Sequence, residues 1–136
     1  MNVKRAKELL ELHEARRTRM YKCSAGFNTI GIGHNLDANP ISERAVDIIF
    51  EDDLNGVLND LTKNLPWWRN LSENRQLVLV DMCFNLGIGR LLGFKHTLKA
   101  MEEGRYEDAA KGMEQSLWAT QVGSRAIRLI KMMREG

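Results

Sequence analysis

Cysteine and proline are scarce in this chain, which has two of each among 136 residues. The two thiols, Cys23 and Cys83, are too few for a disulfide framework and lack a metal-ligand spacing around them, so we expect both to be free. Long apolar runs are also missing: the N-terminal segment MNVKRAKELLELHEARR has none longer than two residues. This excludes a signal-peptide core and a membrane span in that segment and predicts a protein made and folded in the cytoplasm.

An excess of charge of one sign is missing too. Twenty Lys and Arg against eighteen Asp and Glu leave a formal charge of +2, which does not mark a nucleic-acid binder or a membrane-surface protein. Residues 1–22 are nevertheless basic, with seven Lys and Arg against three Glu. The length suits one domain that can bury a hydrophobic core without disulfide bonds or metal ions to stabilise it.

The spacing of apolar residues predicts mostly helices. A first helix over 3–14 places Glu14 near its end, and strand formers around the turn signal Ser24-Ala25-Gly26 predict a hairpin or three-stranded ribbon over about 19–36. A long helix over about 42–64 ends before Pro66. The expected remainder is helices over 72–86, 94–103, 106–116 and 124–134, with a flexible glycine corner over 87–93.

This order of elements predicts an α+β fold in a single domain. A small N-terminal lobe, about 1–41, carries the first helix and the short antiparallel sheet. The linking helix, about 42–64, joins it to an all-helical lobe, about 65–136. We expect a ligand cleft between the lobes.

Glu14 is a candidate general acid for glycoside hydrolysis, because the C-terminal end of a helix disfavours a charged carboxylate. Cys23 follows it by nine residues and Thr29 by six more, within YKCSAGFNTIGIGH. This pattern resembles the bacteriophage-type lysozymes, the endolysin muramidases of glycoside hydrolase family 24. That family carries Glu, then Asp or Cys, then Thr at this spacing, and the Thr opens a T-x-G-x-G-H segment. The resemblance extends to MCFNLGIGRLLGF and RYEDAAKGMEQSLWATQVGSRAIRLI.

The resemblance implies a lysozyme-like fold and assigns roles to particular residues. Glu14 becomes the general acid, while Cys23 and Thr29 flank the scissile sugar and hold the attacking water. Arg125 matches a family arginine that pairs with the catalytic acid. The predicted substrate-binding residues are Gly31 and Gly33, which let the backbone approach the glycan, Phe84 and Asn85, which match a cleft-facing aromatic and amide, and Arg125.

The chain departs from the family pattern at several positions. Cys23 stands where most relatives have Asp, and a neutral thiol is a poor base. The stretch after His34 is shorter than in many relatives. Leu117 stands where relatives often have arginine, and Gly112 stands where a polar sugar-contacting residue is common, so we expect subsite preferences to differ. His34 and Trp118 are predicted to be structural.

The resemblance implies a peptidoglycan hydrolase, a lysozyme that cleaves the β-1,4 bond between N-acetylmuramic acid and N-acetylglucosamine with no metal or cofactor. We expect a monomer that binds glycan strands, with no nucleic-acid partner and no stable membrane association. It would wait in the host cytoplasm until a holin opens the inner membrane, and then act on the periplasmic wall. A tail component, a lytic transglycosylase that gives anhydro products, a catalytically weak wall-binding relative and a basic DNA binder built on residues 1–22 are the alternatives.

Overall fold

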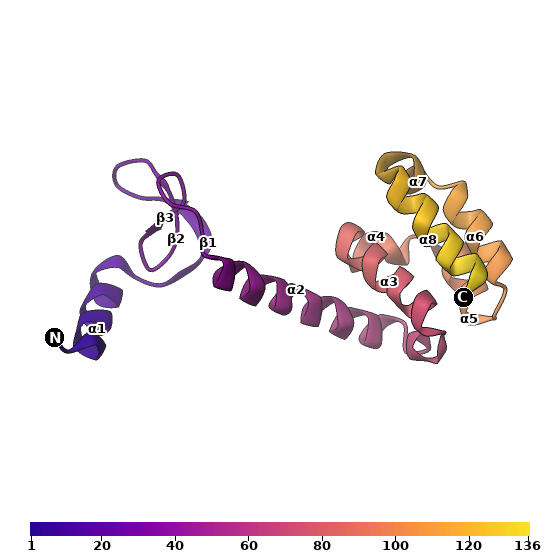
Figure 1. Cartoon of the computed structure of the whole chain (residues 1–136), viewed down its shortest axis with the longest axis horizontal. Coiled ribbons are helices and arrows are strands. Elements are labelled where there is room, and N and C mark those ends of the chain that lie inside the picture. The colour runs from indigo at the N-terminus through magenta and orange to yellow at the C-terminus, as the bar shows by residue number, and fades with distance from the viewer. The chain divides into compact units, whose positions relative to one another are not determined.

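The computed structural model describes residues 1–136, and they divide into two compact units, Met1–Ile48 and Ile49–Gly136. Figure 1 labels the elements along the chain. The N-terminal unit holds a helix and a small sheet, and the C-terminal unit is entirely helical. This confirms the predicted α+β fold class.

The N-terminal unit begins with helix α1, Val3–Glu14, whose N-cap Asn2 accepts a hydrogen bond from the Arg5 amide. Three antiparallel strands follow in the order β1-β2-β3: Arg17–Lys22, Asn28–Gly31 and His34–Asn35. Thr29 in the central strand faces Tyr21 of β1 and Asn35 of β3. The predicted ribbon is therefore present, with two more residues at its start.

Asp37 stabilises the end of this sheet through hydrogen bonds to Asn28. Its carboxylate accepts hydrogen bonds from the backbone and the side-chain amide of Asn28, at 2.7 and 3.1 Å. These bonds hold the pKa of Asp37 below its usual range. Thr29 is the one residue of this unit that is buried, so the unit has no apolar core of its own.

Helix α2, Glu43–Asn64, runs through the boundary between the units and matches the predicted helix closely. Its first turn is capped by Ser42, whose hydroxyl accepts from the Ala45 amide. It ends two residues before Pro66, which lacks the amide hydrogen that a helix interior needs.

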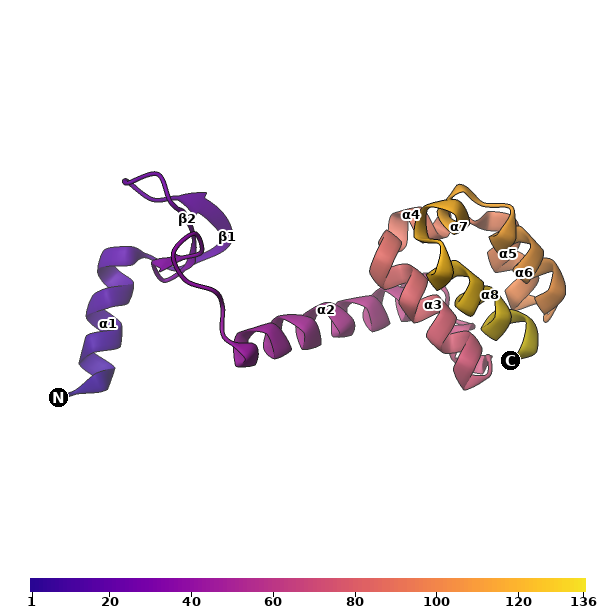
Figure 2. The same cartoon turned by 45° about the horizontal axis from the view of Figure 1, so that its top comes forward.

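The helical unit holds the whole apolar core, which extends from Leu61 to Met133. Helix α8 contacts three others, and α5 packs on α6 (Figure 1 and Figure 2). Arg75 ties α3 to the end of α8 by donating to the Met133 and Arg134 carbonyls while its guanidinium covers the Tyr106 ring. The elements are η1 Trp68–Asn70, α3 Glu73–Leu86, α4 Ile88–Leu92, α5 Lys95–Glu102, α6 Tyr106–Glu114, α7 Leu117–Val122 and α8 Ser124–Glu135.

Two short helices were not predicted. The expected flexible corner over 87–93 is wrong, because Ile88–Leu92 forms α4 and its Leu91 is completely buried. Helix α7 is capped by Ser116, whose hydroxyl accepts from the Ala119 amide, and is anchored by the buried ring of Trp118. In both helices a buried side chain outweighs the local preference for an irregular chain.

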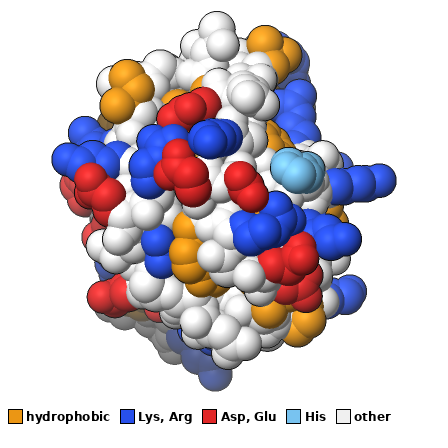
Figure 3. Space-filling model, turned by 90° about the vertical axis from the view of Figure 1, so that its right-hand side faces the viewer, with side chains coloured by type: hydrophobic (Ala, Val, Ile, Leu, Met, Phe, Trp, Pro, Cys, Tyr) orange, Lys and Arg blue, Asp and Glu red, His pale blue; other side chains and the backbone are white.

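The surface of the helical unit carries both signs of charge side by side, as the face in Figure 3 shows. Arg105 pairs with Glu103 and Asp108, and Arg134 pairs with Glu107 and Glu114. No helix of the chain is both long and apolar enough to cross a membrane.

Candidate active site

Glu14 is the last residue of α1, and its side chain is exposed. The chain turns sharply after it: Ala15 has φ +64° and ψ 166°, a region that non-glycine residues rarely occupy. The Ala15 amide still donates to the Glu11 carbonyl, and Arg16 pairs with the Glu11 carboxylate at 2.7 Å. The end of the helix thus places Glu14 directly before the first strand of the sheet.

The Glu14 carboxylate lies against Gly33, in the turn that joins β2 to β3. A Cβ atom added at Gly33 would stand 2.8 Å from Glu14 Oε2 and 3.0 Å from Cδ. Gly33 also has φ +70°, which favours glycine. The vacant side of Gly33 thus lies against the candidate acid. The approach of the Gly33 backbone to the glycan remains a prediction.

Cys23 and Thr29 lie at the other end of β2, around the β1–β2 turn. The Cys23 amide donates to the Phe27 carbonyl, and the Gly26 amide donates to the Cys23 carbonyl. The Thr29 hydroxyl donates to the same Phe27 carbonyl at 2.9 Å, and only 3% of Thr29 is exposed. A hydroxyl oxygen that donates in this way keeps lone pairs with which it can accept from water.

The Cys23 thiol lies in the β1–β2 turn, near backbone N–H groups and the Thr29 hydroxyl. Backbone N–H groups of Phe27 and Ala25 lower the pKa of the Cys23 thiol, desolvation opposes them, and the Thr29 hydroxyl and the Gly26 amide lower it further. The hydroxyl of Thr29 has one proton, which it can give either to the Phe27 carbonyl or to the Cys23 thiolate. Cys23 is therefore a partly exposed thiol whose pKa these groups lower.

Cys83 provides the contrast. It is 2% exposed in the core of the helical unit, and burial together with the charge of Asp60 raises the pKa of its thiol. Both cysteines are free, as the sequence analysis predicts.

The remaining residues of the glycine-rich turn have local roles. Gly31 shares φ +70° with Gly33, but an added Cβ there would meet nothing within 4 Å. His34 Nε2 lies 3.1 Å from the Asn39 carbonyl, which can only accept, so this nitrogen carries a proton.

Phe84 and Asn85 lie next to each other near the end of α3, and both are exposed. The Phe84 ring meets the Phe50 ring edge-on, with centroids 5.7 Å apart. Asn85 Oδ1 accepts from the indole Nε1 of Trp118 at 3.1 Å. The structure thus places the predicted aromatic and amide on one turn of one helix.

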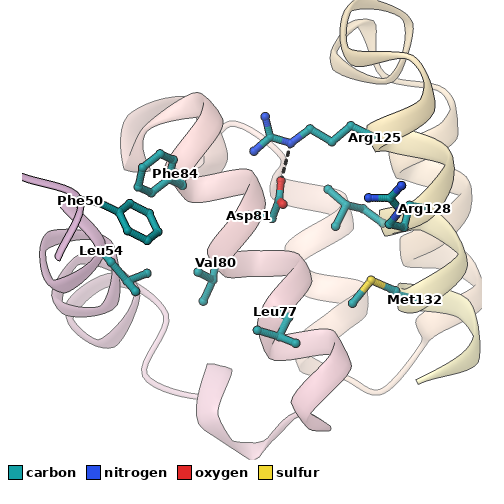
Figure 4. A pocket seen from close by; sticks show the side chains of 10 residues that line it. Phe50, Leu54, Leu77, Val80, Asp81, Phe84, Arg125, Arg128 and Met132 are labelled. Carbon is teal, nitrogen blue, oxygen red and sulfur yellow. Dashed lines mark hydrogen bonds and ion pairs between the residues drawn. The ribbon is translucent and has the colours of Figure 1, made fainter. Parts of the chain in front are cut away.

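An open apolar groove of about 500 Å³ lies between α2, α3 and α8 (Figure 4). Leu54, Leu77, Val80 and Met132 contribute to its floor and sides, together with the two phenylalanines. Arg125 lies at its edge, where its Nε donates to Asp81 Oδ1 at 2.7 Å. Sequence reasoning missed Asp81, since an Asp in an apolar helix gives no sign of its partner 44 residues later. The pairing of Arg125 with Glu14 remains a prediction.

Gly112 has a packing role that the sequence did not suggest. An added Cβ at Gly112 would stand 2.3 Å from Thr97 Oγ1, at the contact between α5 and α6. Leu117 is largely exposed on α7. The structure brings together no group of three or more His, Cys, Asp or Glu side chains that could hold a metal ion.

Comparison with known families decides where this arrangement belongs. The family model described as phage lysozyme matches residues 11–134, a span that contains every candidate residue from Glu14 to Arg125. The chain belongs to the phage lysozyme family. This match confirms the resemblance to the phage lysozyme family that the sequence shows.

Curated relatives come from an amoeba and from phages. "Probable T4-type lysozyme 1" of Dictyostelium discoideum is 28% identical over 159 positions, covering 96% of this chain and 94% of the relative. The "Pre-baseplate central spike protein Gp5" of Enterobacteria phage T4 is 29% identical, covering 95% of this chain and 27% of that protein. The "Peptidoglycan hydrolase gp36" of Pseudomonas phage phiKMV is 29% identical, covering 93% of this chain and 15% of that protein. An alignment of 159 positions exceeds the 136 residues of this phage lysozyme family member, so the amoebal relative has residues that this chain lacks.

Proposed function

We propose that this chain is a lysozyme that hydrolyses the β-1,4 bond between N-acetylmuramic acid and N-acetylglucosamine in peptidoglycan. The observation that carries the proposal is the family match over residues 11–134, with Glu14, Cys23 and Thr29 all inside it. A relative that covers most of this chain is named a peptidoglycan hydrolase, which supports the same substrate.

Glu14 acts as the general acid in this proposal. Its exposed carboxyl group gives a proton to the glycosidic oxygen as the bond to the anomeric carbon breaks. Arg16, the arginine nearest in sequence, pairs with Glu11, and the Glu14 carboxyl has no ion pair within its own unit. The vacant side of Gly33 leaves room for that carboxyl beside the β2–β3 turn.

Thr29 and Cys23 bind and activate the attacking water on the other side of the sugar. Thr29 accepts a hydrogen bond from the water, and the Cys23 thiolate takes the water's proton as its oxygen bonds to the anomeric carbon. Glu14 then holds a carboxylate, Cys23 holds a thiol, and proton exchange with solvent resets both. The placement of Cys23 and Thr29 around the same turn supports a shared role at this water.

The positions of these groups favour inversion of the anomeric centre. Glu14 lies by the turn after β2 and Cys23 by the turn before it, so the length of the four-residue strand separates them. At about 3.3 Å per residue this is roughly 10 Å, whereas a retaining enzyme needs its two groups about 5 Å apart. A thioglycosyl intermediate is therefore disfavoured.

Phe84, Asn85, Gly31 and Arg125 are proposed to contact the glycan, with the Phe84 ring against an apolar sugar face. We further propose that the protein works as a monomer and waits in the host cytoplasm until a holin opens the inner membrane. A place in a phage tail is the alternative suggested by the spike-protein relative, of which this chain matches 27%.

The turbidity of chloroform-treated Gram-negative cells tests the proposal. Wild type should clear the suspension, and Glu14→Gln should lose nearly all of that activity because it cannot donate the proton. Glu8→Gln is the matched control, since Glu8 is another exposed glutamate of α1. Equal clearing by wild type and Glu14→Gln would refute the assignment of the acid.

A lytic transglycosylase is a second candidate, because position 23 lacks the carboxylate that most relatives carry. In that reaction the sugar's own hydroxyl attacks, so Cys23 would have no water to deprotonate. Cys23→Asp should keep or raise hydrolytic activity under our proposal, whereas Cys23→Ser should lower it. Complete loss of hydrolytic activity in Cys23→Asp would instead show that the reaction requires the thiol itself.

A further inference from the structure

The link between α1 and β1 contains a strained residue, Ala15. It has φ +64° and ψ 166°, and every other residue of the chain with a positive φ is a glycine. The Cβ atom of alanine makes this region unfavourable, so the conformation persists only where the surrounding structure holds it. Ala15 directly follows Glu14, and relaxation of its backbone would therefore move Glu14 relative to the sheet.

Glu11 bonds to the chain on both sides of the Ala15 Cα atom. Its carbonyl accepts from the Ala15 amide at 2.9 Å, and its Oε1 accepts from the Arg16 Nε at 2.7 Å. The side chains that face each other on a helix are three or four residues apart, whereas Arg16 follows Glu11 by five. The pair thus forms because the chain leaves the helix at Ala15, and it favours the conformation in which the chain does so.

The bond from Arg16 to Glu11 is the one ion pair of the N-terminal unit. The neighbouring arginines of β1 do not duplicate it: the guanidinium of Arg17 lies over the Tyr21 ring at 4.7 Å, and Arg19 has no carboxylate partner. The charged contact at this link therefore belongs to Glu11 and Arg16 alone.

We propose that Glu11 and Arg16 form a clasp that holds Ala15 in its strained conformation, and that both are positioning residues for Glu14. The inference rests on the proposed function, in which Glu14 is the general acid. Neither residue of the clasp touches the glycan in it. Opening the clasp lets Ala15 relax, which shifts the carboxyl group of Glu14 and slows proton donation, so kcat should fall while KM stays the same.

Arg16→Gln opens the clasp, and the release of reducing ends from purified peptidoglycan gives kcat and KM. Both side chains are partly exposed, and an exposed ion pair shifts an equilibrium by a factor of about two to five. We expect kcat to fall by about that factor. Arg19→Gln removes the same charge from an exposed position that has no ion pair, and it should keep the wild-type kcat. Equal kcat values in the two variants would refute the clasp.

A double-mutant cycle with Ala15→Gly tests the strain. Glycine adopts the conformation of Ala15 without a Cβ penalty, so the clasp is no longer needed to hold it. Arg16→Gln should therefore lower kcat in the wild-type background and change it little when it is combined with Ala15→Gly. If Arg16 acted on Glu14 through its charge alone, the loss would be the same in both backgrounds, and that result would refute the clasp.

NMR of protein labelled with ¹³C-alanine gives a readout that needs no activity, because the chemical shifts of Ala15 report its backbone conformation. The shifts should move towards ordinary values in Arg16→Gln and stay as in wild type in Arg19→Gln. Unmoved shifts in Arg16→Gln would refute the clasp. If wild type releases no reducing ends, the proposed function fails, and the NMR comparison still decides whether the clasp holds Ala15.

Discussion

Replacing Gly33 by alanine should displace the proposed general acid, Glu14, without unfolding the protein. The new methyl carbon would stand 2.8 Å from Glu14 Oε2, about 0.6 Å short of ordinary contact at about 3.4 Å. The carboxylate is the flexible end of a side chain, so it can move away at little cost in stability. A displacement of about 1 Å of a catalytic group can cost roughly a hundredfold in rate, and we therefore expect kcat to fall about tenfold or more.

Gly31→Ala is the control that isolates this displacement. Both glycines have φ +70°, so alanine at either position costs about 1 to 2 kcal/mol of backbone energy. An added Cβ at Gly31 meets nothing within 4 Å and leaves Glu14 where it is. The two variants should unfold at similar temperatures and differ in kcat.

The assay combines thermal unfolding with the release of reducing ends from purified peptidoglycan at saturating substrate. Gly33→Ala should lie about tenfold or more below Gly31→Ala in kcat. Equal kcat values in two equally stable variants would show that the contact between Gly33 and Glu14 does not position the acid, and would refute the reasoning.

Other predictions concern the thiols, the helical core and the sheet. Iodoacetamide should modify Cys23 with a pH midpoint below the usual thiol value of about 8.5 and should leave Cys83 intact in the folded protein; mass spectrometry of each site checks both. Gly112→Ala should cost about 1 to 3 kcal/mol in free energy of unfolding, because its Cβ would overlap Thr97 Oγ1. Thr97→Ala should recover most of that loss in the double variant, and additive losses in denaturant melts would contradict the clash. The lowered pKa of Asp37 means that its stabilising effect is complete above its unfolded pKa of about 3.9 and is lost as the pH falls through the lower, folded value. Limited proteolysis of the N-terminal unit across this range should show the loss in wild type and a flat response in Asp37→Asn.

The sequence was sufficient for the longer elements, because their signals are local. Helices α1, α2 and α3 have regular apolar spacing, and residues such as Ser42 and Ser72 cap two of them through side-chain hydrogen bonds. The ribbon was predictable from its strand formers and from the turn at Ser24-Ala25-Gly26. The candidate acid, thiol and hydroxyl were found through the resemblance of their spacing to the bacteriophage-type lysozyme pattern, and the family match covers them all.

The missed features depend on residues far apart in sequence. Helix α4 forms around Leu91, whose burial requires the rest of the core. The bond from Trp118 to Asn85 spans 33 residues, and the pair of Arg125 with Asp81 spans 44. The contact of Glu14 with Gly33 likewise depends on how the helix enters the sheet. Periodicity and propensity carry no information about such partners.

Mass spectrometry of the fragments released from purified peptidoglycan tests the central claim most directly. Wild type should release fragments that end in reducing N-acetylmuramic acid, and Glu14→Gln should release almost none. Anhydro-muramic ends in the wild-type digest, or undiminished release by Glu14→Gln, would contradict a water-dependent lysozyme whose acid is Glu14.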